Sequence, residues 1–243
     1  MKSTEDFFEK FRDIRPYVDD EIPSVVKRLV RNELLISAIK MIKWPSCPAI
    51  LSAPANFFIR MTLAGKLKNI STIDDFQTII VSYLLNWVLT HSIDGLTCSG
   101  IEELPSDQRY IFISNHRDIV LDSAFINYFL YQNKHRVAYI AFGDNLLINE
   151  SVSDLIRMNK AFIVKRGLPP KEQLKALKLL SEYMNHIRRQ GENLWIAQRE
   201  GRAKDGVDIT NPAIIKMLYL SERKDKFDFS EFIKICKIIV IWI

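Results

Sequence analysis

The second half of the chain alternates short apolar runs with longer segments of helical periodicity, and this alternation constrains the fold most. Apolar runs of strand length occur at six places, near residues 95–99, 109–114, 136–142, 160–165, 192–198 and 237–242. Apolar residues at helical spacing occur between them, near 121–132, 150–157, 171–190 and 211–221. Such alternation is typical of crossover units. The sequence therefore predicts an α/β fold, with a mostly parallel sheet flanked by helices.

The first ninety or so residues are helical in character. Acidic residues and a proline at 20–23 indicate a helix start, and the apolar spacing that follows predicts one helix ending at Trp44-Pro45. Further helices are predicted near 55–66 and 73–91. We therefore expect an N-terminal helical region over 1–94 and an α/β domain over 95–243.

The first predicted helix is basic and amphipathic. Its polar positions include five cations, Lys27, Arg28, Arg31, Lys40 and Lys43. A helix of this kind can lie on an anionic bilayer. It can equally pack against a protein core and leave its charged face in water. The pattern alone leaves both interpretations open.

The overall composition limits the class of protein but does not identify a binding partner. The chain has 243 residues, with 34 Lys and Arg against 29 Asp and Glu, a net charge of +5. That excess suits an anionic membrane surface, an anionic substrate or nucleic acid equally well. The cysteines, Cys47, Cys98 and Cys236, lack metal-type spacing, so we expect reduced thiols and no metal site. The start of the chain lacks a signal peptide pattern, and no apolar run is long enough to span a bilayer.

A histidine and two carboxylates follow the apolar run 110–113, where a strand gives way to a helix. These are His116, Asp118 and Asp122. A neutral imidazole accepts a proton near neutral pH, and a carboxylate orients it and stabilises its charged form. The segment therefore predicts a general base with its partner. A structural histidine at a strand end is the other interpretation.

Two further strand ends carry charged residues. The run 161–164 is followed by Lys165 and Arg166, and the run 194–197 by a segment at 198–206 that contains Arg199, Glu200 and Arg202. Cations at a strand's carboxyl end suit a phosphate-bearing ligand, although each segment alone also fits an ordinary solvated loop. In a parallel sheet all these ends lie at one edge. Together they predict a site that activates a hydroxyl on an anionic molecule.

These segments resemble the glycerolipid acyltransferase family, which acylates glycerol 3-phosphate and lysophosphatidic acid. The family's first block is Asn-His, four residues and Asp; Asn115-His116 and Asp122 are similar, with five residues between. Its second block, an apolar strand ending in basic residues, is similar to 162–166. The stretch 140–146 resembles glycerol-3-phosphate acyltransferases in particular.

The family's third block is Phe-Pro-Glu-Gly-Thr-Arg followed by small and basic residues and Gly. The segment 198–206 matches it at Glu200, Gly201, Arg202 and Gly206. It lacks the Pro and is one residue shorter after Gly201. The resemblance covers roughly residues 110–206.

The resemblance implies an enzyme in which His116 is the general base. Asp122 is implied as its partner, with Asp118 as the second candidate. The phosphate of the acceptor would be bound by Arg166 and Arg202, with help from Lys165 and Arg199, and Glu200 and Gly201 would complete the substrate-binding loop.

The resemblance also implies the partners. The acyl donor would be a thioester, acyl-CoA or acyl-acyl carrier protein, used as a co-substrate with no further cofactor. The acceptor would be a phosphorylated glycerol, and nucleic acid would not be a partner. We expect a cytoplasmic protein, peripheral on the inner face of the membrane. The competing expectation is a catalytically degenerate, membrane-associated lipid-binding protein of the same fold.

The family's fourth block, a strand with a Val-Pro segment, would follow within a few dozen residues. The apolar run 237–243 occupies that place and contains no proline. We therefore hypothesise a truncated or frameshifted member whose last strands are missing.

Overall fold

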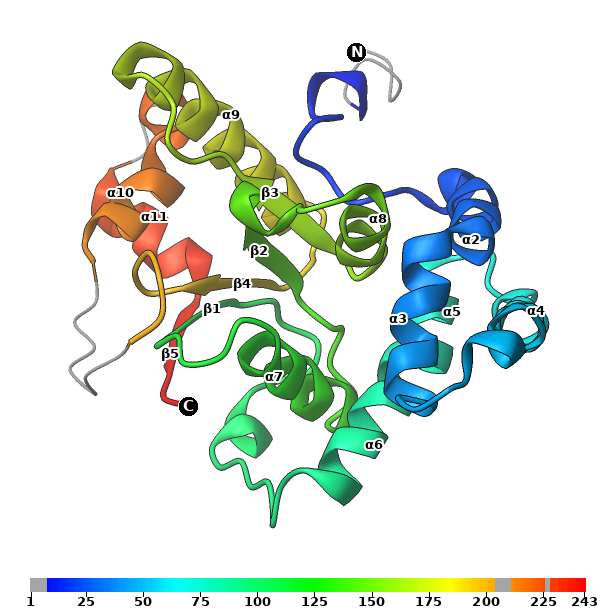
Figure 1. Cartoon of the computed structure of the whole chain (residues 1–243). Helices are drawn as coiled ribbons and strands as arrows, with labels where there is room; N and C mark the ends of the chain where they lie inside the picture. The colour runs from blue at the N-terminus through cyan, green and yellow to red at the C-terminus, as the bar shows by residue number, and fades with distance from the viewer. Residues whose placement is uncertain (1–7, 204–210, 226–227) are drawn as a thin grey trace. The chain divides into compact units, whose positions relative to one another are not determined.

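The protein folds into two compact units (Figure 1). The computed structural model describes residues 8–203, 211–225 and 228–243. One unit, the sheet unit, comprises the described parts of Met1–Arg15, Ile93–Asn145 and Ala161–Ile243. The other, the helical unit, comprises Pro16–Ser92 and Leu146–Lys160.

The sheet unit is built on five parallel strands in the order β3-β2-β4-β1-β5. Its elements are β1 (Ile111–Ser114), α7 (Leu121–Gln132), β2 (Tyr139–Gly143), β3 (Ala161–Val164), α9 (Pro170–Arg189), β4 (Leu194–Ala197), α10 (Ala213–Tyr219), α11 (Phe229–Cys236) and β5 (Ile238–Ile241). The central strands are apolar and buried because helices cover both faces of the sheet. The predicted α/β fold and its parallel sheet are confirmed.

The helices of the sheet unit lie on opposite faces according to the direction of each crossover. The connection through α7 runs from β1 toward β2, whereas those through α9 and through α10 and α11 run the other way across the sheet. Right-handed crossovers in opposite directions must use opposite faces. Accordingly α7 lies on one side of the sheet and α9, α10 and α11 lie on the other (Figure 1).

The helical unit is assembled from short helices around one apolar core. They are α2 (Ile22–Arg31), α3 (Glu33–Lys43), α4 (Ser52–Leu67), α5 (Ile73–Phe76), α6 (Ser82–His91) and α8 (Glu150–Met158), with a π-helical turn at Gln77–Val81. The core residues include Ile22, Leu29, Phe76 and Met158, each at most 3% exposed. Among the described helices, none combines the length and apolarity that crossing a bilayer demands.

A buried carboxylate joins α8 to the start of the helical unit. The Asp154 side chain is 2% exposed and accepts hydrogen bonds from both Nε and Nη2 of Arg28, at 2.9 and 2.7 Å. Tyr17 Oη donates to the same carboxylate at 2.6 Å. Burial, reinforced by this hydrogen bond, raises the pKa of Tyr17 to about 12. A bidentate pair of this kind fixes geometry as well as contributing energy.

Two sequence predictions about the elements are wrong. The helix expected to run unbroken to Trp44 divides at Asn32, whose backbone is extended and whose side chain accepts from Leu35 N at 3.0 Å. Asparagine is a preferred N-cap, so it starts α3 as a new helix. The strand expected at 95–99 is absent and that segment is largely exposed. Its polar residues Thr97, Cys98 and Ser99 leave too little apolar surface for a strand buried on both faces.

Candidate active site

The carboxyl ends of β1 and β4 meet where the chain changes direction through the sheet. The two strands are neighbours, and their register pairs Ser114 with Ala197, so the ends lie level. The chain leaves β1 through α7 on one face and leaves β4 through α10 and α11 on the other (Figure 1). Ligands in open α/β sheets bind in the crevice at such a point. The segments 115–120 and 198–203 therefore border the candidate site.

His116 and Asp122 form a hydrogen-bonded pair at the end of β1. Nδ1 of His116 lies 2.9 Å from Oδ2 of Asp122, and the side chains are 17% and 2% exposed. The same carboxylate accepts from the backbone N–H of Arg117 at 2.7 Å and of Asp118 at 3.0 Å. With Nδ1–H donating to Asp122, the neutral imidazole carries its lone pair on Nε2. This is the arrangement of a general base with an orienting carboxylate.

Asp118 bonds to the backbone of the turn between His116 and Asp122. This turn accommodates five intervening residues, one more than in the family block. Asp118 Oδ1 accepts from Val120 N at 2.9 Å and Leu121 N at 2.8 Å, so Asp118 caps the turn that leads into α7. Burial raises the pKa of the Asp118 carboxyl. The two backbone hydrogen bonds and the charges of Arg202 and His116 outweigh this, and the pKa lies below its ordinary value. Asp118 therefore shapes the turn, and Asp122 is the carboxylate that contacts His116.

Trp195 packs beside the imidazole and holds the end of β1. Its indole Nε1 donates to Ser114 Oγ at 2.9 Å, and its ring meets the His116 ring edge-on at 6.2 Å between centroids. Trp195 is 3% exposed and Ser114 is fully buried. Because both neighbours are fixed, the His116 ring has little freedom to turn away from Asp122.

The segment after β4 links the histidine to the basic end of β3. Ala203 N donates to the backbone oxygen of His116 at 2.7 Å. Glu200, which is 73% exposed at its side chain, pairs with Arg166 at 3.5 Å between Oε1 and Nη1. Between them the backbone turns at Gly201, whose φ of +76° is a left-handed conformation that favours glycine. One loop thus contacts residues from two strand ends.

Arg166 lies close above the end of β2. A Cβ added at Gly143 would fall 3.0 Å from Arg166 Cζ and 2.5 Å from Asn145 Oδ1, so any other residue would force these two side chains to shift. Asp144 Oδ2 accepts from Arg166 N at 3.3 Å. The register of β2 and β3 pairs Gly143 with Val164, which brings these residues to the same edge.

The other sequence-predicted residues lie at the same strand ends. Lys165 is half-buried after β3, with its backbone oxygen bound by Gln173 Nε2 at 3.1 Å. Arg199 is half-buried after β4, and Arg202 is exposed and close enough to Asp118 to influence its charge. Gly206, at the end of the third sequence block, lies outside the described residues.

An apolar groove adjoins the His116 segment. It has a volume of about 490 Å³ and runs between β1, β5, α7 and the segment 96–104, with walls that include Phe112, Phe125, Phe129, Ile239 and Ile243. Asn115, the residue before His116, is 2% exposed and exchanges two hydrogen bonds with the backbone of Ile243, at 2.7 and 2.8 Å. The wall of the groove is thereby tied to the segment that carries the histidine.

Comparison with known protein families identifies the part of the chain that contains this site. Residues 95–212 match the model of the family described as Acyltransferase. This part of the chain is therefore similar to the acyltransferase family. The match extends over the His116 pair, Arg166 and the loop after β4, and it leaves the helices before residue 95 outside. Among curated proteins, none matches the sequence.

Sequence reasoning missed two residues that support the candidate site. Trp195 fits the apolar pattern of β4, so nothing in the sequence separates it from an ordinary core residue. Gly143 does leave a signal, because a glycine closing an apolar strand often marks a close approach of another group. That signal gives no indication of the approaching group, which is Arg166.

Proposed function

We propose that this protein transfers a fatty acyl group from a thioester carrier to a hydroxyl of glycerol 3-phosphate or lysophosphatidic acid, in phospholipid synthesis. The observation that carries the proposal is the 2.9 Å contact between His116 Nδ1 and Asp122 Oδ2 within the region similar to the acyltransferase family. The arginines that follow β3 and β4, at the same edge of the sheet, support a phosphorylated acceptor.

In the proposed reaction, His116 Nε2 accepts the proton of the acceptor hydroxyl as its oxygen attacks the thioester carbonyl. A carbon–oxygen bond forms and gives a tetrahedral intermediate. The carbon–sulfur bond then breaks, and the imidazolium returns its proton to the leaving thiolate. Asp122 holds the ring and stabilises its positive charge, because its own hydrogen bonds keep it in place. General base action of this kind contributes about 10²–10⁴ in rate.

We assign the acceptor's phosphate to Arg166 and Arg202, with Lys165 and Arg199 adding positive charge. Arg166 is paired with Glu200 at 3.5 Å, and this carboxylate is largely exposed. An exposed ion pair is worth little, so a phosphate dianion can displace Glu200 from Arg166 at small cost. Glu200 is then available to orient the acceptor or the arginines.

We assign the acyl chain to the apolar groove beside Asn115. The groove is walled by aromatic and aliphatic side chains and is tied to the His116 segment by the pairing of Asn115 with Ile243. The donor would be acyl-CoA or acyl-acyl carrier protein, with no other cofactor. Since the acyl donor and the product carry fatty chains, we propose a cytoplasmic enzyme that works peripherally on the inner membrane face.

A degenerate, lipid-binding protein of the same fold is the second candidate. The observation that favours it is the extra residue between His116 and Asp122 relative to the family block. The turn capped by Asp118 accommodates that residue and leaves the two side chains in contact. The geometry therefore supports catalysis over the degenerate alternative.

The phosphate assignment gives a direct test of the proposed function. Purified protein would be incubated with labelled acyl-CoA or acyl-acyl carrier protein and four acceptors: glycerol 3-phosphate, lysophosphatidic acid, glycerol and monoacylglycerol. We expect ester products only with the phosphorylated acceptors. Arg166→Ala should raise the KM for the acceptor by about tenfold or more, because it removes a charge-assisted contact worth ~1.5–3 kcal/mol.

The matched control is Arg136→Ala. Arg136 precedes β2 at the opposite end of the sheet, where it pairs with Glu192, and it should leave the KM unchanged. Absence of any ester product with all donors and acceptors would overturn the proposed function. Equal use of phosphorylated and unphosphorylated acceptors would overturn the phosphate assignment.

A further inference from the structure

The end of α3, the first ten residues of α4 and the connection between them expose an unusual amount of apolar surface. The most exposed side chains there are aliphatic or aromatic: Met41 at 72%, Ile42 at 79%, Ile50 at 86%, Phe57 at 65%, Phe58 at 60% and Met61 at 60%. Scattered apolar residues on a surface are normal, but a concentration of this kind marks an interaction site. We call this set the apolar tip of the helical unit.

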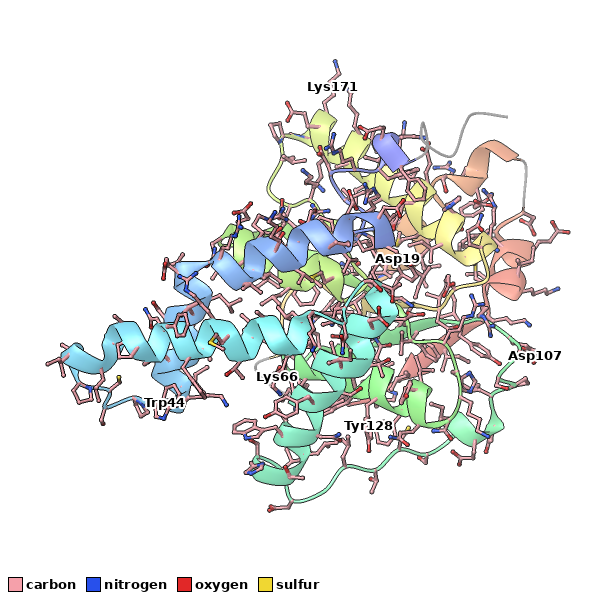
Figure 2. All side chains as sticks on the ribbon, turned by 90° about the vertical axis from the view of Figure 1, so that its right-hand side faces the viewer. Asp19, Trp44, Lys66, Asp107, Tyr128 and Lys171 are labelled. Carbon is pink, nitrogen blue, oxygen red and sulfur yellow. The ribbon has the colours of Figure 1, made fainter. Side chains whose placement is uncertain are left out.

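One member of the apolar tip, Phe58, lines a shallow hollow together with side chains of the connection. Trp44, Leu51 and Phe58 line the same shallow hollow, and the Trp44 and Phe58 rings lie 6.4 Å apart. Trp44, labelled in Figure 2, follows directly on α3. Phe57, Phe58 and Met61 share neighbouring positions on α4, which packs against α3. The two helices and their connection therefore present their apolar side chains together.

The charge around the apolar tip is mainly positive. Residues 34–73 contain five cations, Lys40, Lys43, Arg60, Lys66 and Lys68, and no aspartate or glutamate, and Arg60 is paired with Glu33 just before this range. Lys43 lines the same hollow as Trp44. Lys66 lies 4.1 Å from the centre of the Tyr83 ring, which adds an aromatic side chain beside a cation. Apolar residues bordered by lysine and tryptophan are the pattern of a surface that enters the headgroup region of a bilayer.

We propose that the apolar tip docks the protein on an anionic phospholipid bilayer. The charge distribution favours a bilayer over a second copy of the chain. In a two-fold interface the same patch would face itself, and the lysines of both copies would oppose one another. Phospholipid headgroups with negative charge instead attract each lysine by about 1 kcal/mol near the surface. The inference rests on the membrane partner of the proposed function, but it concerns residues outside the region similar to the acyltransferase family.

The test is sedimentation of the purified full-length protein with vesicles. Vesicles of phosphatidylglycerol mixed with phosphatidylcholine should bind the protein, and vesicles of phosphatidylcholine alone should bind it more weakly. The double variant Ile50→Ser and Phe57→Ser should lower the partition onto anionic vesicles by at least about tenfold, because both side chains lose apolar burial. Lys43→Glu should also lower it, and added salt should weaken the binding of the unchanged protein.

Matched variants separate this inference from the proposed function. Leu174→Ser removes an apolar side chain that is 49% exposed on α9 in the sheet unit, and it should leave vesicle binding unchanged. His116→Ala should bind vesicles normally, whatever its activity. The double variant should keep its circular dichroism spectrum and its activity on a water-soluble, short-chain acyl thioester, so a loss of vesicle binding is not a loss of folding.

Three results would overturn the inference. The first is that the protein fails to bind anionic vesicles. The second is that the double variant binds these vesicles as well as the unchanged protein does. The third is that the unchanged protein forms a dimer, the double variant is a monomer, and neither binds vesicles. The third result would assign the apolar tip to self-association.

Discussion

At the scale of single residues, the two carboxylates after β1 have different tasks. Asp122 contacts His116 and two backbone N–H groups, whereas Asp118 caps the turn before α7. The sequence alone favoured Asp122 but left Asp118 open, because both follow the histidine closely. The different roles of Asp118 and Asp122 depend on the hydrogen bonds of a local turn, and the spacing of the residues in the sequence does not predict these hydrogen bonds.

This difference predicts unequal losses for two substitutions. Asp122→Asn should lower kcat/KM by about 10²–10⁴, because the amide can donate to Nδ1 and so favour the tautomer that lacks a lone pair on Nε2. Asp118→Asn should cost no more than about tenfold, since its side-chain oxygen can still cap the turn. Steady-state acyl transfer measures both. A larger loss in Asp118→Asn would contradict the assignment.

The close approach of Arg166 to Gly143 predicts a second effect of a single substitution, on the binding of the acceptor. A Cβ at this position would meet the Arg166 guanidinium at 3.0 Å and Asn145 Oδ1 at 2.5 Å. Gly143→Ala should therefore displace Arg166 and raise the KM for the phosphorylated acceptor by about tenfold, equivalent to ~1.4 kcal/mol. Gly95→Ala is the matched control, because a Cβ there has open space around it. An unchanged KM in Gly143→Ala would contradict the role given to Arg166.

At the scale of elements, the strands were more predictable than the helix boundaries. The runs that became β1, β3 and β4 are almost entirely apolar and largely buried, and such burial leaves these runs few alternatives. The helix through residues 22–43 was predicted as one piece, because apolar periodicity continues across Asn32. The periodicity of apolar residues cannot reveal a single residue that leaves the helical conformation and caps the next helix.

The break between α2 and α3 at Asn32 predicts a measurable effect on the free energy of unfolding. Asn32→Ala should lower the free energy of unfolding by about 1 kcal/mol, because Leu35 N loses its capping acceptor. Asn32→Asp retains an acceptor and should cost much less. Urea denaturation followed by circular dichroism compares the three proteins. A stability in Asn32→Ala equal to that of the unchanged protein would show that the cap contributes nothing.

At the scale of the whole molecule, the chain combines a region similar to the acyltransferase family with N-terminal helices that lie outside that match. The family blocks predicted candidate site residues from sequence, and the structure places these residues at strand ends on one edge of the parallel sheet. The contacts that support the candidate site could not be predicted from the sequence. The Trp195 ring beside His116, the glycine under Arg166 and the pairing of Asn115 with Ile243 each join residues far apart in the chain.

The central claim is that His116 is the base for acyl transfer to a phosphorylated glycerol. The most direct measurement is the rate at which purified His116→Ala protein acylates glycerol 3-phosphate and lysophosphatidic acid, beside the unchanged protein and His91→Ala, an exposed histidine on α6. We predict that His91→Ala retains full activity and that His116→Ala loses about 10²–10⁴ in kcat/KM while remaining folded. Activity of His116→Ala near that of the unchanged protein would contradict the account.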